Sequence, residues 1–554
     1  MSKEYVFVPL GGVGEIGMNI AMYGFGPPKK RKWLVVDVGV TFPGPELPGV
    51  DLVLPDISFA EKVRKDIVGI VITHAHEDHY GALLALWERL KVQVYATPFA
   101  ADMISSKREG FDGGPDFDVE TYEAGDTFTV GPFEIEALHV THSIPEPVSL
   151  AIRTELGVAL HTGDWKLDDE PALGKPTDEA HFRRLGDEGV LALICDSTNA
   201  MRDGVSPSER EVGEGIAEVI AKAKGRVFVT TFSSNVGRIR SIALAAQKSG
   251  RRVLIMGRSL MRVAQVAEDN GYMDGIHPFL QPNDFQTTDR NKIVVILTGS
   301  QGEDRAALAR LARDDHPFAR ISAGDTVVFS SRTIPGNERP ILEVRNGLID
   351  QGVAVVEDGR DAIVHVSGHP RINELKQMYE WTRPQIGIPV HGEPQHLAAQ
   401  AELMGEAGIP SVMSIRDGDM VRLAGGDVEV TGTVPYGRIY KDGRLVGTEE
   451  QVGVKQRRVV AAVGHVVVSI VVDRDGDLAC DADLQAIGLP SRTPRGEDME
   501  DALFEAAMEA FDGLARKRRR DVEVIENAVE KAVRNTARGI WGKKPWVTVM
   551  VAKV

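Results

Sequence analysis

The chain has 554 residues, a formal net charge of −17 and only two cysteines, Cys195 and Cys480. This length predicts two to four domains, and two cysteines exclude a disulfide framework, which favours a reducing, cytoplasmic compartment. The acidic balance argues against a protein that coats nucleic acid indiscriminately, and no apolar run approaches the roughly 18 residues that a membrane span needs.

The N-terminal segment combines two predicted strands, residues 5–10 and 33–39, with a glycine-rich turn at residues 11–17. The turn sequence, Gly-Gly-Val-Gly-Glu-Ile-Gly, resembles a dinucleotide fingerprint, but no helix of sufficient length follows it. We therefore interpret it as a turn that brings backbone close to a metal or phosphate. Asp37, near the end of the second strand, is expected to orient metal-binding histidines.

A histidine-rich loop, Thr73-His74-Ala75-His76-Glu77-Asp78-His79, follows the apolar run 67–72 and precedes a predicted helix. This pattern predicts strand, tight loop and helix, with the loop at the carboxyl end of a buried strand. In an extended segment His74 and His76 point to the same side, so both can reach one cation. Asp78 and His79 follow the bend and face a neighbouring position, so the loop predicts two adjacent metals.

Three further predicted strands end in potential ligands: residues 126–142 in His142, residues 157–165 in Asp164, and residues 190–199 in Asp196. Strand alternation places His139 and His142 on opposite sides, so only one of them is expected to reach the site. We choose His142, at the strand end, and interpret His139 as a core histidine or one that supports a ligand. Asp164 is well placed to bridge two cations.

The residue pattern changes near residue 205, where potential metal ligands become rare. Ser206 is the predicted N-cap of a helix, with Pro207 at the first helical position and Glu209 three residues after the cap. Alternating helices and apolar strands then predict an inserted α/β domain with a parallel sheet at residues 206–364. Histidines return at His365, His369 and His391, which indicates that residues 365–445 complete the metal-binding domain.

Residues 446–458 are a predicted linker, and residues 459–554 a small α+β domain. Strands are expected within 459–472, two helices within 498–533, and a last strand at 546–551. The run Arg516-Lys517-Arg518-Arg519-Arg520 is the strongest basic cluster in the chain. It is either a solvated helix face or a contact for phosphates or a partner.

These residues resemble a known family. His74, His76, Asp78, His79, His142 and Asp164 are similar to the ligand motifs of the metallo-β-lactamase fold, and Asp196, His369 and His391 to the three additional motifs of β-CASP nucleases. Residues 231–235, 298–303, 334–338 and 367–369 resemble the bacterial ribonuclease J family specifically, and the similarity covers essentially the whole chain. It implies a metallo-β-lactamase αββα sandwich (1–205 and 365–445), an inserted β-CASP α/β domain (206–364) and the C-terminal α+β domain.

The resemblance implies two zinc ions per subunit. One would be bound by His74, His76 and His142, the other by Asp78, His79 and His391, with Asp164 bridging them. Only His391 enters this set through the resemblance alone. Manganese or magnesium could replace zinc, because carboxylates contribute to both positions.

A metal-activated water would then hydrolyse RNA phosphodiesters and leave 5′-phosphates. His369 is the expected proton donor for the departing 3′ oxygen, and Asp196 is expected to raise the pKa of His369 and fix its orientation. His369, Asp196 and the ligand Asp78 form the predicted catalytic set.

Family members cut RNA internally and also degrade single-stranded RNA from the 5′ end, with a preference for a 5′-monophosphate. Candidate donors to that phosphate are Ser233, Ser234, His365, Ser367, Gly368 and His369. Within the family, a histidine at the position of His391 is associated with RNA substrates. A homodimer or higher homo-oligomer and an RNA-degrading complex are implied as well.

Three alternatives remain. A catalytically silent partner subunit would bind RNA or a sister nuclease, but it would be expected to have lost a ligand. A DNA nuclease of the same superfamily is disfavoured by His391. A thioesterase or lactamase acting on a small molecule has no need for an inserted domain of roughly 150 residues.

Overall fold

The computed structural model describes residues 2–110, 114–334 and 336–554, so Pro335 of the motif at 334–338 lies outside the described residues. The described chain divides into two compact units. The first contains residues up to Thr41 together with Leu54–Arg438, and the second contains Phe42–Val53 together with Ile439–Val554. The second unit therefore begins before the expected linker, and it includes a short N-terminal segment that no sequence pattern indicates.

Two sheets face each other in the first unit. The first has the order β21-β20-β1-β2-β3-β5-β6-β7, with β1 Glu4–Gly11, β2 Ile20–Gly26, β3 Lys32–Val36, β5 Ile67–Val71, β6 Val94–Ala96, β7 Val119–Thr121, β20 Asp419–Ala424 and β21 Glu429–Thr433. The second has the order β19-β18-β12-β11-β10-β9-β8, with β8 Thr127–Val130, β9 Phe133–His139, β10 Val148–Thr154, β11 Gly157–His161, β12 Val190–Asp196, β18 Ile386–Val390 and β19 Ser411–Val412. Apolar side chains of both sheets, such as Tyr23, Phe133 and Ile194, form the core between them.

Helices cover the outer faces of the two sheets. They are α1 Ser58–Lys62, α2 Glu77–Tyr80, α3 Leu83–Leu90 and α4 Pro98–Glu109 in the N-terminal part, and α5 Glu179–Glu188, α12 Ile372–Thr382 and α13 Pro394–Glu406 later in the chain. Phe59 of α1 packs edge-on against Trp33 of β3, with ring centroids 5.3 Å apart. Phe182 of α5 and Leu375 of α12 pack in one apolar cluster with residues of β12. This is the predicted αββα arrangement.

Strand register brings distant parts of the chain to one edge. β12 lies between β11 and β18 and is parallel to both, with Asp196 opposite Val390. Because the carboxyl ends of parallel strands meet at the same edge of a sheet, Asp196 and His391 come together although the inserted domain separates them in sequence. In the first sheet, β3 and β5 are also parallel, and Val36 opposite Val71 brings Asp37 near the histidine-rich loop.

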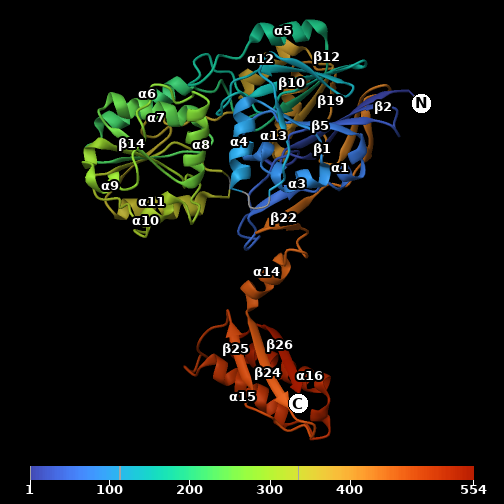
Figure 1. Ribbon diagram of the computed structural model, residues 1–554, viewed down its shortest axis with the longest axis vertical. Helices are drawn as coiled ribbons and strands as arrows, with labels where there is room; N and C mark the ends of the chain where they lie inside the picture. Colours follow the sequence, from blue (N-terminus) through green and yellow to red (C-terminus); the bar gives the residue numbers. More distant parts are fainter. Residues whose placement is uncertain (1, 111–113, 335) are drawn as a thin grey trace. The chain divides into compact units, whose positions relative to one another are not determined.

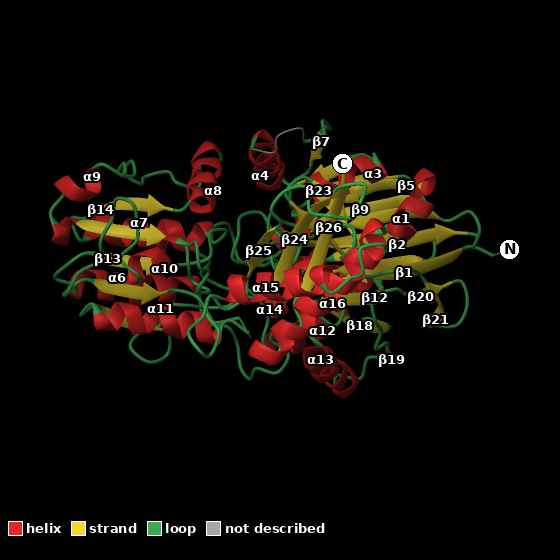
Figure 2. Ribbon diagram, turned by 90° about the horizontal axis from the view of Figure 1, so that it is seen from below, coloured by secondary structure: helices red, strands yellow, loops and turns green. Residues whose placement is uncertain are grey.

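Residues 227–357 form a five-stranded sheet in the order β14-β15-β13-β16-β17, and every neighbouring pair is parallel. Its strands are β13 Val227–Thr230, β14 Arg252–Met256, β15 Ile293–Leu297, β16 Thr326–Phe329 and β17 Ala354–Glu357, and its helices are α6 Glu209–Lys222, α7 Val236–Lys248, α8 Arg258–Asp269, α9 Asp284–Thr287, α10 Ala307–Ala312 and α11 Glu338–Asp350. Figure 1 shows α6 and α7 on one side of this sheet and α10 and α11 on the other. The strands run in the same direction between helices in Figure 2.

The first helix of this domain begins two residues later than predicted. Its N-cap is Ser208, whose side chain accepts a hydrogen bond from the Glu211 backbone N–H. Ser206, the predicted cap, instead donates its hydroxyl to the buried carboxylate of Glu374. Glu209 could not complete a capping box with Ser206, because its carboxylate is paired with Arg238.

In the second unit a three-stranded sheet, β25-β24-β26, carries two helices (Figure 1). The elements of this domain are β24 His465–Val472, β25 Asp483–Ile487, β26 Trp546–Lys553, α15 Met499–Asp512 and α16 Val522–Trp541. They are preceded in the chain by β22 Arg438–Asp442, β23 Leu445–Gly447 and α14 Val454–Val463. A separate sheet has the order β23-β22-β4, with β4 at Leu52–Pro55. The segment expected to be a linker therefore contains regular structure. The strand expected from residue 459 begins only at His465, because α14 occupies residues 454–463.

The basic cluster at 516–520 is engaged within its own domain. Arg516 pairs with Asp477, Arg520 pairs with Asp475 at 2.8 Å, and the guanidinium of Arg519 lies over the Phe511 ring. These three side chains contact the turn between β24 and β25 or the end of α15, while Arg516 and Arg520 stay 66% and 54% exposed. Among the residues that the structure describes, no helix is long and apolar enough to cross a bilayer.

Candidate metal centre

The seven predicted ligands gather into two groups that share one residue. The first group is His74, His76, His142 and Asp164, and the second is Asp78, His79, Asp164 and His391. Within each group the potential ligand atoms all lie within 4.8 Å of one another. The segments that follow β5, β9, β11 and β18 supply them, with Asp78 and His79 in the short helix α2, so four strand ends converge on one place.

In the first group three ring nitrogens and a carboxylate face a common point. Nδ1 of His76 lies 3.1 Å from Nε2 of His74 and 3.0 Å from Nε2 of His142. Oδ2 of Asp164 lies 3.8 Å and 3.7 Å from the same two Nε2 atoms. Imidazoles and a carboxylate in this arrangement are a donor set that suits a divalent metal ion.

The second group contacts both oxygens of Asp164. Oδ1 of Asp164 lies 3.2 Å from Nε2 of His79, and Oδ2 lies 3.5 Å from Nε2 of His391. Asp78 completes the group, with Oδ2 3.7 Å from Nε2 of His79 and 3.9 Å from Nε2 of His391. Asp164 is thus the one residue that belongs to both groups, as a bridging ligand requires.

The outward-facing nitrogens of three rings are held by neighbours. Nδ1 of His79 lies 2.7 Å from Oδ2 of Asp37, and Nδ1 of His142 lies 2.7 Å from the Gly368 carbonyl. Thr73 donates its hydroxyl to Asp37, so its oxygen accepts from Nδ1 of His74 at 3.0 Å. Such contacts fix the tautomer and aim Nε2 inward, which is the support that metal-binding histidines need.

Two buried atoms of the centre fit a bound cation. Oδ1 of Asp164 and Nε2 of His391 are inaccessible to solvent and make no hydrogen bond within the described residues. Buried polar atoms rarely remain unpaired, because their desolvation is costly. A divalent cation between the ligands would satisfy both atoms.

The electrostatics of the centre also favour a cation. Burial would raise the pKa of Asp164, but His391, His79 and His369 hold it well below its usual value. Burial lowers the pKa of His76 to about 4 and depresses that of His142, so these rings are neutral and can act as ligands. The ionised Asp164 carboxylate offers negative charge and the neutral His76 and His142 rings offer lone pairs, whereas Asp164, Asp37 and Asp78 raise the pKa of the His79 ring well above its ordinary value against the effect of burial.

His369 and Asp196 form a hydrogen-bonded pair beside the ligands. Nδ1 of His369 lies 2.7 Å from Oδ2 of Asp196, whose other oxygen accepts from the Thr198 backbone N–H at 2.8 Å. Burial disfavours the protonated ring, but the carboxylates of Asp196 and Asp164 outweigh it and raise the pKa of His369 to about 9. At neutral pH this imidazolium holds a proton that it can donate.

The candidate phosphate-binding residues have different surroundings. The hydroxyl oxygen of Ser367 accepts from the Asn199 amide at 2.9 Å. A Cβ at Gly368 would lie 2.5 Å from Cε1 of His142, so only glycine fits there. Burial, Arg238 and Arg332 lower the pKa of His365 to about 3, so its imidazole is neutral.

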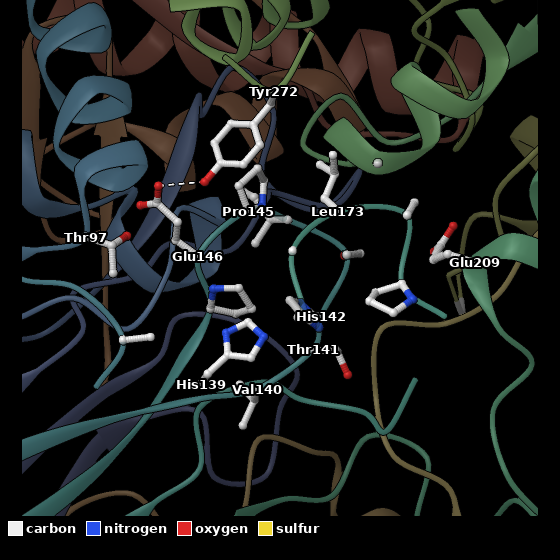
Figure 3. A pocket seen from close by; sticks show the side chains of 18 of the residues that line it. Thr97, His139, Val140, Thr141, His142, Pro145, Glu146, Leu173, Glu209 and Tyr272 are labelled. Carbon is white, nitrogen blue, oxygen red and sulfur yellow. Dashed lines mark hydrogen bonds between the residues drawn. The ribbon is translucent and has the colours of Figure 1, made fainter. Parts of the chain in front are cut away.

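Ser233 and Ser234 are half-buried in the loop after β13. The structure does not join them to Ser367 or Gly368. Asn235 of the same loop lines a cavity of about 340 Å³ that His142 also lines. Figure 3 shows this cavity, with Tyr272 and Glu146 across from His142. The Tyr272 hydroxyl donates a hydrogen bond to the Glu146 carboxylate at 2.7 Å.

His139 also lines this cavity instead of lying in the core (Figure 3). Its Nε2 donates to the Lys175 carbonyl at 2.7 Å, and it belongs to neither ligand group. Sequence reasoning missed Thr73, Asn199 and Asn19, which contact site histidines or their neighbours. Asn19 lies two residues after the glycine-rich turn, and only its partners in space reveal its position.

Models of known families match most of the chain. They are the metallo-β-lactamase superfamily at residues 28–235, the ribonuclease J β-CASP domain at 224–348, a Zn-dependent metallo-hydrolase RNA specificity domain at 353–414, and the ribonuclease J C-terminal domain at 452–554.

Curated relatives match it along nearly its whole length. A protein named ribonuclease J from Sinorhizobium meliloti is 56% identical over 552 residues, covering 100% of this chain and 98% of that protein. One of the same name from Mycolicibacterium smegmatis is 37% identical, covering 98% and 96%. A solved protein of unknown function from Enterococcus faecalis V583 shares the fold, with a TM-score of 0.53 at 15% identity over 76% of this chain and 100% of its own. The chain is a member of the ribonuclease J family within the metallo-β-lactamase superfamily.

Proposed function

We propose that this chain hydrolyses RNA phosphodiesters at a two-cation centre, leaves 5′-phosphates, and both cuts RNA internally and degrades 5′-monophosphorylated single strands from the 5′ end. As a ribonuclease J-type metallo-hydrolase it is a metal-dependent ribonuclease. The observation that carries the proposal is the pair of ligand groups that share Asp164, with His369 and Asp196 beside them. We propose two Zn²⁺ ions per subunit, with Mn²⁺ or Mg²⁺ as alternatives.

Two bound divalent cations would lower the pKa of a shared water toward neutrality and offset charge that develops on the phosphoryl oxygens. His74, His76 and His142 would hold one cation, and Asp78, His79 and His391 the other. Asp164, which belongs to both groups, would keep the two cations adjacent. Without its two oxygens the groups would share no ligand.

Departure of the 3′ oxygen needs a proton, and His369 is the proposed donor. Its ring stacks on His391 with centroids 5.5 Å apart, so it lies at the edge of the ligand groups. Asp196 holds Nδ1 and thereby leaves Nε2 as the atom that carries the transferable proton. The raised pKa keeps that proton in place at neutral pH.

The proposed 5′-phosphate site consists of Ser233, Ser234, His365, Ser367, Gly368 and His369. Its support is the continuity of residues 367–369 with the metal centre, since Gly368 contacts His142 and His369 contacts Asp196. A neutral His365 would serve as a hydrogen-bonding group and not as a cation, and its buried Nδ1 has no partner among the described residues.

We further propose the domain division 1–205, 206–364, 365–445 and 459–554, with a linker at 446–458. We also propose assembly as a homodimer or higher homo-oligomer and participation in an RNA-degrading complex. A catalytically silent partner subunit is the second candidate function. No specific observation favours it, because all seven proposed ligands are present and gathered.

The deciding experiment uses one RNA sequence labelled at each end in separate preparations. It is supplied with a 5′-monophosphate, with a 5′-triphosphate, and as its DNA counterpart. We expect release of labelled mononucleotide from the 5′ end of the monophosphorylated RNA, slower release from the triphosphate, and none from DNA. Equal degradation of DNA would favour the DNA nuclease, and no cleavage with any divalent cation would favour the silent subunit.

A further inference from the structure

The side-chain amide of Asn19 lies between two proposed ligands that are far apart in the sequence, His79 and His391. Its Oδ1 is 2.8 Å from Nδ1 of His391, a separation of 372 residues in sequence, and its Nδ2 is 3.1 Å from Nε2 of His79. The Asn19 backbone N–H donates to the Asp78 carbonyl at 2.9 Å. Asn19 thus contacts the three residues that form the second ligand group with Asp164.

The orientation of this amide determines which nitrogen of His391 is free. Nδ2 of Asn19 donates to the Asp78 carbonyl at 3.0 Å, so Oδ1 must be the atom that faces His391. An amide oxygen can only accept, so Nδ1 of His391 carries the proton. In the neutral ring this tautomer leaves the lone pair on Nε2, the atom that faces Asp164 and Asp78 at 3.5 Å and 3.9 Å.

His391 needs this support, because its backbone has φ 52°, a left-handed conformation that is strained for a residue with a side chain. Its N–H donates to the Gly12 carbonyl at 2.7 Å, in the glycine-rich turn before Asn19. Gly12 itself has φ +86°, and a Cβ there would lie 2.4 Å from Oδ1 of Asn19. The turn that resembles a dinucleotide fingerprint therefore makes room for the Asn19 amide and fixes the His391 backbone.

We propose that Asn19 is a positioning residue for the second cation. It holds His391 in the Nδ1–H tautomer with Nε2 toward the cation, so the second position is complete only when the N-terminal turn and the returning strand β18 are both in place. This inference rests on the proposed two-cation centre. The first group, His74, His76 and His142, makes no hydrogen bond to Asn19 and serves as an internal reference.

The test measures Zn²⁺ binding by the full-length protein after removal of bound metal, using competition with a chromophoric chelator and a direct metal count. The variants are Asn19→Ala, which removes the amide, and Asn19→Asp, which keeps an oxygen to accept from His391. The matched control is Asn527→Ala in α16, which removes one exposed amide-to-backbone hydrogen bond far along the chain. Thermal unfolding of the metal-free proteins shows whether each variant is folded.

We expect wild type and Asn527→Ala to bind two Zn²⁺ ions with the same affinities. In Asn19→Ala the affinity of one position should fall about 10–100-fold while the other is retained, and Asn19→Asp should recover most of the loss. Unchanged binding in Asn19→Ala, an equal loss at both positions, a metal-free protein that no longer melts cooperatively, or no recovery in Asn19→Asp would overturn the inference. Fewer than two ions on the wild type would instead overturn the two-cation centre itself.

Discussion

Each histidine of the two ligand groups, apart from His76, has one nitrogen held by a neighbour and the other directed inward. The holding atoms belong to Thr73, Gly368, Asp37 and Asn19. They are a hydroxyl, a backbone carbonyl, a carboxylate and an amide, so no single residue type marks this role. His76 differs because it faces its group through Nδ1.

Removing His76 should therefore abolish nuclease activity and leave the fold intact. His76→Ala deletes the nitrogen closest to both other rings of the first group, and no neighbour can replace it. Activity on 5′-monophosphorylated RNA and bound metal should both fall, while the circular dichroism spectrum and melting temperature of the metal-free protein stay unchanged. Exposed His277 in the inserted domain gives the control His277→Ala, which should keep full activity. Unchanged turnover in His76→Ala would refute the metal centre.

The raised pKa of His369 predicts the alkaline limit of the reaction. The ring is protonated below about 9, so kcat should fall as pH rises through that value. Asp196→Asn removes the largest favourable charge, so the pKa of His369 should drop toward that of a free histidine, about 6.5. In a profile of kcat measured from about pH 6 to about pH 10, the fall at alkaline pH should then move to lower pH. An identical limb in Asp196→Asn would exclude His369 as the proton donor.

Ligand spacing within one loop is visible in sequence, because an extended segment or a strand end fixes side-chain direction over a few residues. His74, His76, Asp78 and His79 could be placed that way, and Asp164 could be placed from the end of its strand. His391 needed the family resemblance, since its partners lie hundreds of residues away. Asn19 was missed for the same reason, because nothing local distinguishes it from any other asparagine near a turn.

At the scale of elements, strands with an apolar core were predicted closely, and helix starts less well. β1 spans Glu4–Gly11, where residues 5–10 were predicted, whereas α6 begins after Ser208 and not after Ser206. Both serines have a glutamate three residues later, so the capping pattern alone cannot choose between them. The choice depends on the buried pairing of Glu209 with Arg238, which is a tertiary contact.

That pair joins α6 to α7 and should contribute strongly to the stability of the inserted domain. Arg238 is fully buried and binds Glu209 at 2.9 Å and the Ser330 hydroxyl at 2.6 Å. Arg238→Met leaves a buried carboxylate unpaired and should cost about 3–5 kcal/mol in the free energy of unfolding. The double variant Arg238→Met with Glu209→Leu should recover much of this loss, because no buried charge remains.

Urea denaturation of the wild type, Arg238→Met, Glu209→Leu and the double variant measures the coupling free energy between Arg238 and Glu209. The exposed pair Arg339–Glu343 of α11 provides the control, and Arg339→Met should leave the denaturation midpoint unchanged. A midpoint for Arg238→Met equal to that of the wild type would mean that the buried carboxylate has found another partner.

At the scale of the whole molecule, the inserted domain and the C-terminal domain are continuous in sequence, and changes in residue pattern indicated both. The segment Phe42–Val53 could not be predicted in the same way. It belongs to the unit formed by residues 439–554, although it lies in the first tenth of the chain. Arg457 donates to the Pro48 carbonyl at 2.9 Å, and the Asp51 N–H donates to the Lys441 carbonyl at 2.9 Å.

The position of a C-terminal truncation should therefore decide whether the remaining protein melts cooperatively or aggregates. A chain that ends after Gly464 keeps β22, β23 and α14 and removes only the three-stranded domain, whose core consists of its own residues. A chain that ends after Arg438 also removes Lys441 and Arg457, and with them the rest of the unit to which the buried side chains Leu47, Val50 and Val53 belong, so we expect these side chains to become exposed. Each exposed side chain costs about 1.5–3 kcal/mol.

Size-exclusion chromatography and thermal unfolding of the two truncated proteins provide the comparison, with Zn²⁺ content as the common reference. The chain ending at Gly464 should elute as a discrete species, melt cooperatively and bind the same number of Zn²⁺ ions as the full-length protein. The chain ending at Arg438 should melt at lower temperature and aggregate, because an unpaired apolar segment attracts other copies. Equal melting temperatures would mean that residues 42–53 need no partner from the C-terminal unit.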